Sequence, residues 1–262
     1  MKILGVLCVV LAAALGAAGM VGYLTFLRPP DNPPSDACAK PAERPRVVAA
    51  GASMTQGSLG PDWVAALRAK HPGYEFVNAG VNGNTIADLR QRVETDIVAC
   101  HPVAVTLLIG TNDVRNEVPL DQYRDDLRTV VDRVKTATGA RLAIMSLPPL
   151  GEDPDTDINR RLAGYNAVIK EIATQTKIDY LPLHERFTDI LGQGGQARTA
   201  YGFSFPLAFG AAVQHYLLRR SWDEIARRGG RELLVDHVHL TDRGGAILAD
   251  LTTSWLSAPA AS

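Results

Sequence analysis

The stretch VAVTLLI at residues 103–109, followed by GTND at residues 110–113, decides the fold class of this chain. An unbroken run of apolar and β-branched residues is typical of a strand that is covered on both faces, as in a parallel sheet. Similar short runs occur at residues 47–50, 75–78, 141–146 and 180–183. Amphipathic stretches separate the runs and predict helices at residues 62–70, 85–99, 120–138, 158–176 and 244–256. The alternation predicts repeated βα units and therefore an α/β protein with a parallel five-stranded sheet.

The N-terminal segment is long and apolar. No charged residue occurs between Lys2 and Arg28, and at about 1.5 Å per residue this is long enough to cross the roughly 30 Å hydrocarbon core as a helix. A secretory signal has an apolar region of only about 7 to 15 residues, so the length favours a retained membrane anchor at residues 1–28 over a cleaved signal peptide. The positive-inside rule places the N-terminus in the cytoplasm. We expect a single-pass protein of the cell membrane with an extracytoplasmic domain, or, as the alternative, a protein secreted after cleavage.

The remaining chain divides into a linker, one domain and a tail. Prolines recur through residues 29–45 and predict a stiff spacer. Residues 46–257 hold the βα units, and residues 258–262 form a tail. An insertion at residues 188–230 interrupts the alternation; it begins with a glycine-rich loop at residues 192–195, and Ser221 and Glu224 have the spacing of a helix cap near its end. It forms either a helical hairpin that completes the core or a lid or acyl-chain pocket built from Tyr201, Phe203, Phe205 and Phe209. These aromatic residues favour an acyl chain of some length.

Charge and cysteine content limit the partners and the compartment. The chain has 27 Lys and Arg against 28 Asp and Glu, so no basic excess favours nucleic-acid binding. Cys38 and Cys100 each lie just before a strand of a predicted neighbouring pair, and an extracytoplasmic address permits oxidation. We expect a disulfide between them, the alternative being two buried thiols. Cys8 lies in the apolar span.

Three loops that follow predicted strands carry unusual sequences. Ligands bind beyond the carboxyl ends of parallel strands. GASMTQG at residues 51–57 places Ser53 between glycines at a tight turn. NAGVNGNT at residues 78–85 contains Gly83, and GTND contains Asn112. Taken one at a time, each loop is also compatible with ordinary helix caps and turns.

The strongest signal is DHVH at residues 236–239, immediately before the final predicted helix. An aspartate three residues ahead of a histidine can accept the imidazole Nδ1–H and leave Nε2 facing a nucleophile. A metal site formed by Asp236, His237 and His239 is disfavoured, because no third histidine-rich element accompanies them. We expect neither a metal nor a cofactor.

Together these four loops resemble the SGNH hydrolases, also called GDSL-type esterases and lipases. The family is named for a serine, a glycine, an asparagine and a histidine in four blocks, which here match Ser53, Gly83, Asn112 and His239. The resemblance implies a flavodoxin-like three-layer α/β/α fold, with Ser53, Asp236 and His239 as the catalytic triad. It also implies an oxyanion hole formed by the backbone N–H groups of Ser53 and Gly83 and the side-chain amide of Asn112. One departure is Ala52, which stands where the family usually has an aspartate.

The expected activity is hydrolysis of a carboxylic ester, of a small molecule, lipid or carbohydrate, through an acyl-enzyme on Ser53. One alternative is an acyltransferase that moves the acyl group to a sugar or lipid hydroxyl. An alternative of another class is a non-catalytic ligand-binding module, or a pseudoenzyme because of Ala52. The sequence leaves the oligomeric state open.

Overall fold

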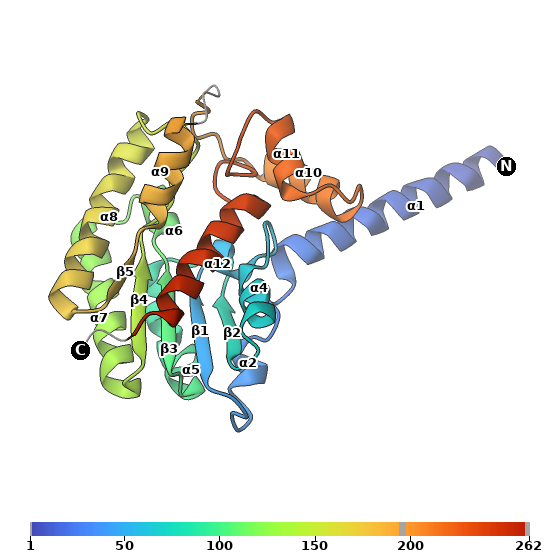
Figure 1. Ribbon diagram of the computed structural model, residues 1–262. Coiled ribbons are helices and arrows are strands. Elements are labelled where there is room, and N and C mark those ends of the chain that lie inside the picture. Colours follow the sequence, from blue (N-terminus) through green and yellow to red (C-terminus); the bar gives the residue numbers. More distant parts are fainter. Residues whose placement is uncertain (1, 194–197, 260–262) are drawn as a thin grey trace.

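The computed structural model describes residues 2–193 and 198–259. Met1, residues 194–197 of the expected insertion with part of its glycine-rich loop, and residues 260–262 of the expected tail lie outside the described residues. Five parallel strands form one sheet in the order β2-β1-β3-β4-β5 (Figure 1). The strands are β1 (Arg46–Gly51), β2 (Glu75–Gly80), β3 (Ala104–Leu108), β4 (Arg141–Met145) and β5 (Asp179–Leu181).

Strand β1 lies inside the sheet because it pairs with both β2 and β3. All six residues of β1 and all five of β3 are buried, as their continuous apolar sequences predict for strands covered on both faces. The order is that of flavodoxin-like folds, in which the chain reverses direction across the sheet between β1 and β3. The expected fold class is confirmed.

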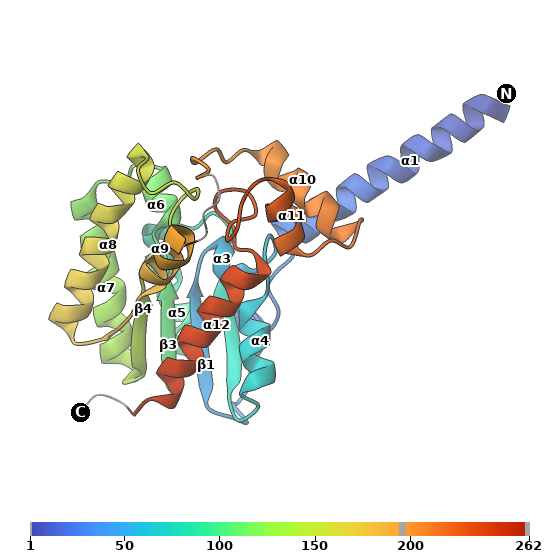
Figure 2. The same ribbon diagram turned by 45° about the horizontal axis from the view of Figure 1, so that its top comes forward.

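Helices cover both faces of the sheet (Figures 1 and 2). Helix α12 packs against α4 and α9 on one face, while α7 packs against α5 and α8 on the other. These helices are α4 (Trp63–Lys70), α5 (Ile86–Asp96), α7 (Leu120–Thr138), α8 (Asp157–Thr176), α9 (Leu183–Gln193) and α12 (Asp242–Ser257). Thr241 caps α12 by accepting the N–H of Gly244.

Two of the differences from the expected boundaries change the structure that follows the element. The helix expected at residues 85–99 ends at Asp96 and is followed by a 3₁₀ turn (Val98–Cys100). The strand expected at residues 180–183 ends at Leu181, and α9 begins directly after Pro182. Proline has no N–H for a strand ladder but is tolerated at a helix start, which explains the early change of structure.

Shorter helices occupy the loops and the insertion. Helices α3 (Ser53–Gln56) and α6 (Thr111–Arg115) directly follow β1 and β3. In the insertion, α10 (Phe205–Tyr216) and α11 (Trp222–Arg228) form a helical pair. Ser221 caps α11 by accepting the N–H of Glu224.

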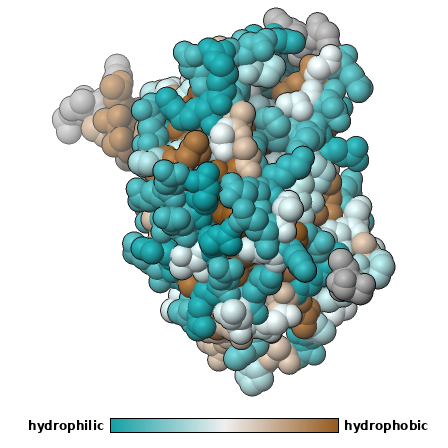
Figure 3. Space-filling model, turned by 90° about the vertical axis from the view of Figure 1, so that its left-hand side faces the viewer, coloured by the Kyte–Doolittle hydropathy of each residue, from teal (hydrophilic) through white to brown (hydrophobic). Residues whose placement is uncertain are grey.

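The N-terminal helix α1 (Lys2–Gly22) continues into a π-helical turn (Tyr23–Leu27). It projects from the domain beside α10 (Figures 1 and 2). Val6–Leu27 is long and apolar enough to cross a membrane, a property that a signal sequence shares. The face of the domain turned away from α1 is largely hydrophilic (Figure 3).

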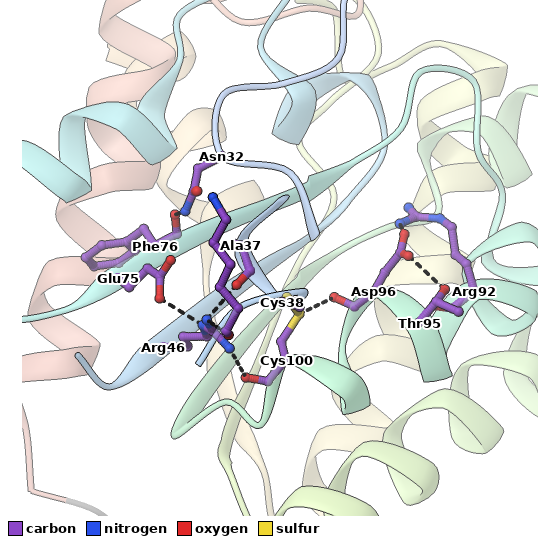
Figure 4. The surroundings of a disulfide bond; sticks show 11 residues. Asn32, Ala37, Cys38, Arg46, Glu75, Phe76, Arg92, Thr95, Asp96 and Cys100 are labelled. Carbon is purple, nitrogen blue, oxygen red and sulfur yellow. Dashed lines mark hydrogen bonds and ion pairs between the residues drawn. A yellow bond between two sulfur atoms is a disulfide. The ribbon is translucent and has the colours of Figure 1, made fainter. Parts of the chain in front are cut away.

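The proline-rich segment, expected to be a stiff spacer, packs on the domain. Its short helix α2 (Pro34–Ala37) contacts β2 and α5. The guanidinium of Arg46, only 3% exposed, donates to the carbonyl oxygens of Ala37 and Lys40 at 2.5 and 2.7 Å. Cys38 and Cys100 form the expected disulfide beside this arginine (Figure 4). The bond joins the segment to the turn before β3.

Candidate active site

The loops with unusual sequences meet at the carboxyl ends of β1, β2 and β3. Ser53 begins α3 immediately after β1, and Asn112 lies in α6 immediately after β3. This is the point at which the strand order reverses, where an open α/β sheet leaves a crevice. The loop before α12 brings His239 to the same edge, although 186 positions separate it from Ser53.

Ser53, His239 and Asp236 form one chain of hydrogen bonds. Ser53 Oγ lies 2.9 Å from His239 Nε2, and His239 Nδ1 lies 2.8 Å from Asp236 Oδ2. The other carboxylate oxygen of Asp236 accepts the backbone N–H groups of Val238 and His239 at 3.1 and 2.8 Å. In this arrangement the imidazole donates from Nδ1 and can take the hydroxyl proton at Nε2.

Burial and nearby charge shift the pKa of the Asp236 carboxyl in opposite directions. Complete burial would raise the pKa of its carboxyl, but the facing imidazole of His239 and the hydrogen bonds to the carboxylate outweigh it, and the pKa is lowered. The group therefore stays ionised. A charged carboxylate in this position holds the imidazole in one tautomer and stabilises its protonated form.

A second buried carboxylate shapes the turn that carries Asp236 and His239. Glu152 accepts the backbone N–H groups of Glu232, Leu233 and Leu234 at 2.7 to 2.9 Å. The N–H of Val235 then donates to the carbonyl oxygen of His239 at 2.7 Å. These bonds fix the backbone on the approach to Asp236.

The three groups expected to form an oxyanion hole lie around one cavity. The cavity has a volume of about 210 Å³, and Ser53, Gly83, Asn112 and His239 line it. Gly83 has a φ of +78°, a conformation that glycine adopts without strain. All three groups therefore lie at the cavity that Ser53 and His239 also line.

Backbone hydrogen bonds hold the turn at Ser53, where Ala52 replaces the usual aspartate. The carbonyl oxygen of Ala52 accepts the N–H groups of Thr55 and Gln56 at 3.1 and 2.9 Å. The guanidinium of Arg92 donates to the carbonyl oxygen of Gly51 at 2.9 Å and to Asn84 Oδ1 at 2.7 Å. Arg92 therefore joins the loops after β1 and β2. The serine turn is supported without a carboxylate at position 52.

Two of the four aromatic residues expected to bind substrate line this cavity. Phe203 and Phe205 lie in its wall, and the Phe203 ring lies 6.1 Å from that of His239. The hydroxyl of Tyr201 instead accepts the Nε–H of Arg115 at 2.9 Å. Phe209 packs against the small apolar cluster that joins α10 and α11 to α1.

Several lining residues were not found from the sequence. Arg115 is one of them. It follows Asn112 by three residues on a helix, a spacing that places two side chains next to each other and could have indicated this contact. Thr25 and Phe26 also line the cavity, but they belong to the apolar span and carried no local signal for a site. The remaining lining residues are Leu59 and Asn82.

His237 lies outside the hydrogen-bonded chain of Ser53, His239 and Asp236. Its carbonyl oxygen accepts the N–H of Gly151 at 2.8 Å. Within residues 2–193 and 198–259, the structure contains no group of three or more His, Cys, Asp or Glu residues placed to hold a metal ion.

Comparisons with known proteins agree with the resemblance of the four loops. The chain is 30% identical over 182 residues to an acetylxylan esterase of Geobacillus stearothermophilus. The aligned region covers 63% of this chain and 81% of the relative. It is 28% identical over 121 residues to an uncharacterized lipoprotein of Bacillus subtilis, covering 40% of this chain and 49% of the relative.

Solved structures share the fold. The acetyl xylan esterase AlAXEase superposes with a TM-score of 0.60 at 19% identity, covering 80% of this chain and 99% of that one. An acetylxylan esterase from Geobacillus stearothermophilus superposes with a TM-score of 0.60 at 23% identity. The match covers 82% of this chain and 95% of that one.

The sequence model of the GDSL-like lipase/acylhydrolase family matches residues 49–247. This range runs from β1, just before Ser53, to α12, just after His239. The chain belongs to the GDSL-like lipase/acylhydrolase family and is a hydrolase that acts on ester bonds.

Proposed function

We propose that the protein removes a short acyl group from a carboxylic ester through an acyl-enzyme on Ser53. The observation that carries the proposal is the continuous hydrogen-bonded chain from Ser53 Oγ through His239 to Asp236. His239 takes the serine proton at Nε2 as Oγ attacks the ester carbonyl, and it returns that proton to the departing alcohol. Water then hydrolyses the acyl-enzyme by the same route, releasing the acid.

The oxyanion of each tetrahedral intermediate is assigned to the backbone N–H groups of Ser53 and Gly83 and to the Asn112 amide. One such donor contributes about 3 kcal/mol to transition-state stabilisation. Solved structures of the Geobacillus enzyme include catalytic mutants that replace a serine, an aspartate and a histidine, the last two separated by three positions. Asp236 and His239 have the same separation, which supports the assigned roles.

Cavity size supports a short acyl group. About 210 Å³ is below the range of roughly 300–1,000 Å³ typical of pockets for drug-sized ligands. The relatives named above are acetylxylan esterases, so an acetyl ester on a carbohydrate is the substrate class that we propose. Transfer of the acyl group to a sugar hydroxyl in place of water uses the same triad and would appear as an acylated acceptor.

The test is labelling and turnover with one matched control. Full-length protein in detergent is treated with a fluorophosphonate probe and assayed on p-nitrophenyl esters of increasing chain length, with and without sugar acceptors. We expect labelling and fastest turnover of the acetyl ester, both abolished by Ser53→Ala. Ser254→Ala, an exposed serine on α12, serves as the control and should retain both. Labelling that persists in Ser53→Ala would overturn the assignment.

We also propose that the N-terminal helix is retained as a membrane anchor. Val21 is completely buried against the domain, and Thr25 and Phe26 line the cavity, so the end of the helix belongs to the fold. The mass of the mature protein extracted from membranes tests this. An intact N-terminal helix is expected, whereas a chain that begins after residue 17 or 18 would identify a cleaved signal.

A further inference from the structure

The end of the N-terminal helix is part of the wall of the cavity at Ser53. Thr25 and Phe26 line this cavity together with Ser53 and His239. The Phe26 ring lies 6.4 Å from the ring of Phe205 in an edge-to-face arrangement. A segment whose composition predicts a membrane span therefore contributes directly to the site.

The last turns of this helix are fastened to the domain along one face. Ala17, Val21, Leu24 and Thr25 are less exposed than their neighbours, and their spacing of four, three and one places them on one side of a helix. Val21 packs in the small apolar cluster with alanines of α10, namely Ala208, Ala211 and Ala212.

Hydrogen bonds reinforce this packing next to the cavity. The carbonyl oxygen of Thr25 accepts Ser58 Oγ–H at 2.7 Å and the Asn82 amide at 3.2 Å. The carbonyl oxygen of Arg28 accepts the Gln56 amide at 2.8 Å. The direction of the helix relative to the cavity is therefore fixed.

The length of the helix sets the depth of the cavity relative to a bilayer. The candidate span Val6–Leu27 has 22 residues, about the number that crosses the roughly 30 Å hydrocarbon core as a helix. Phe26 is the next-to-last residue of this span, so it lies within about 2 Å of its outer end along the axis. The cavity wall at Phe26 therefore lies where the hydrocarbon core meets the headgroup layer.

Exposed apolar and basic residues occur on the element that packs beside this helix. Phe205 is 70% exposed, and Leu217 and Leu218, in the turn after α10, are 45% and 56% exposed. Arg219 is exposed directly after Leu218, and Arg28 is exposed directly after Leu27 at the end of the N-terminal segment. Apolar and cationic side chains together bind an anionic membrane interface. The face turned away from α1 is hydrophilic by contrast (Figure 3).

We propose that the face formed by the end of α1, Phe205 and the Leu217–Leu218 turn rests on the bilayer, so that the cavity opens into the headgroup layer. The substrate is then an acyl ester carried by a membrane-anchored amphiphile, with the ester at headgroup level. This inference rests on the proposed esterase function of Ser53 and on the proposed retention of α1. It narrows the proposed substrate class to acyl esters held at the membrane, such as an acetylated carbohydrate carried on a lipid. A polymer that remains in bulk water would reach the cavity only through the headgroup layer.

The test compares one acyl group presented in two ways. Full-length protein is reconstituted in vesicles of phosphatidylcholine and phosphatidylglycerol, and acetate release is measured from hexadecyl acetate held in the same vesicles and from p-nitrophenyl acetate in solution. The test variant is Leu217→Glu with Leu218→Glu. The control is Val103→Glu, an exposed apolar residue just before β3, at the opposite end of the sheet from the cavity.

For the double variant we expect kcat/KM on hexadecyl acetate to fall about tenfold or more, because two charges oppose contact with the apolar interface, while turnover of p-nitrophenyl acetate stays unchanged. The Val103→Glu control should match the wild type on both esters. Equal rates of the double variant and the wild type on hexadecyl acetate would overturn the inference, as would an equal loss on both esters. Failure of the esterase assignment itself would be distinct, because Ser53→Ala would then retain activity on p-nitrophenyl acetate.

Discussion

The guanidinium of Arg115 donates to Asn112 Oδ1 at 3.0 Å, and this bond fixes the orientation of the Asn112 amide. With Oδ1 occupied, the NH₂ group lies on the side of the Asn84 carbonyl oxygen, to which it donates at 2.9 Å, and keeps its second hydrogen for an oxyanion. Arg115 is itself held over the Phe203 ring at 4.4 Å and against the Tyr201 hydroxyl. We infer that Arg115 is a positioning residue for the oxyanion hole.

Replacing Arg115 tests this role through the balance of kcat and KM. In Arg115→Met the amide of Asn112 loses its orientation, and kcat on p-nitrophenyl acetate should fall by about one to two orders of magnitude, part of the loss seen when an oxyanion donor is removed. KM should change little, because the contact acts in the transition state. Arg133→Met, which removes a surface ion pair with Glu94, is the control. A rise in KM at constant kcat would assign Arg115 to ground-state binding instead.

Asp236 should be required for turnover but not for folding. Asp236→Asn removes the charge that holds the imidazole tautomer, and kcat should fall by about three to four orders of magnitude. Circular dichroism should remain that of the wild type, because the asparagine carbonyl can still accept the backbone N–H groups. The control is Asp250→Asn, whose side chain is 73% exposed in a surface pair with Lys70. Activity within about tenfold of wild type would contradict the assigned role.

Asp113 should make the protein less stable as the pH rises through the mildly acidic range. Burial raises the pKa of Asp113 to about 6, although its carboxylate accepts the Ile86 N–H. Between about pH 4 and pH 6 the folded state therefore holds a proton that the unfolded state has released, so stability falls by about 3 kcal/mol across this window. Above pH 6 both states are ionised and the contribution stays constant.

The variant that isolates this effect is Asp113→Asn, which keeps an acceptor for Ile86 but does not titrate. The difference in unfolding free energy between variant and wild type, measured in urea from pH 4 to pH 7, should change by about 3 kcal/mol in favour of the variant. Other titrating groups cancel in this difference. A difference that is independent of pH would show that Asp113 has an ordinary pKa.

The Cys38–Cys100 disulfide should contribute substantially to stability. It closes a loop with a sequence separation of 62, and the chain-entropy model gives about 4 kcal/mol for such a loop. Cys38→Ser with Cys100→Ser should lower the unfolding free energy by that amount, as should reduction of the wild type. Cys8→Ser is the control, since Cys8 is a free thiol in α1. If reduction leaves the wild-type midpoint unchanged, the bond does not form in the protein.

The sequence predicted the sheet, and it predicted that Ser53, Asp236 and His239 lie together, for a physical reason. Buried strands such as residues 103–109 have continuous apolar sequences, and loops at strand ends must carry the polar groups of a site. Ser53, Gly83 and Asn112 follow β1, β2 and β3, whereas His239 precedes α12. All four line one cavity. The disulfide followed from two cysteines placed before neighbouring strands.

Contacts that depend on how distant segments pack together could not be predicted from the sequence around each residue. Thr25 and Phe26 have the composition of a membrane span, and their place in the cavity wall depends on how α1 packs against α10. Helix α9 was missed because Leu183 was assigned to the preceding strand, whereas Pro182 ends that strand. The proline-rich segment has the composition of a spacer, but a buried arginine and a covalent bond elsewhere in the fold hold it down.

Ser53 and His239 come from opposite ends of the domain, since Ser53 follows the first strand and His239 precedes the last helix. A ribosome therefore makes the serine early and the histidine nearly last. While the chain grows, the Ser53 hydroxyl lacks the imidazole to which it is hydrogen-bonded in the folded domain.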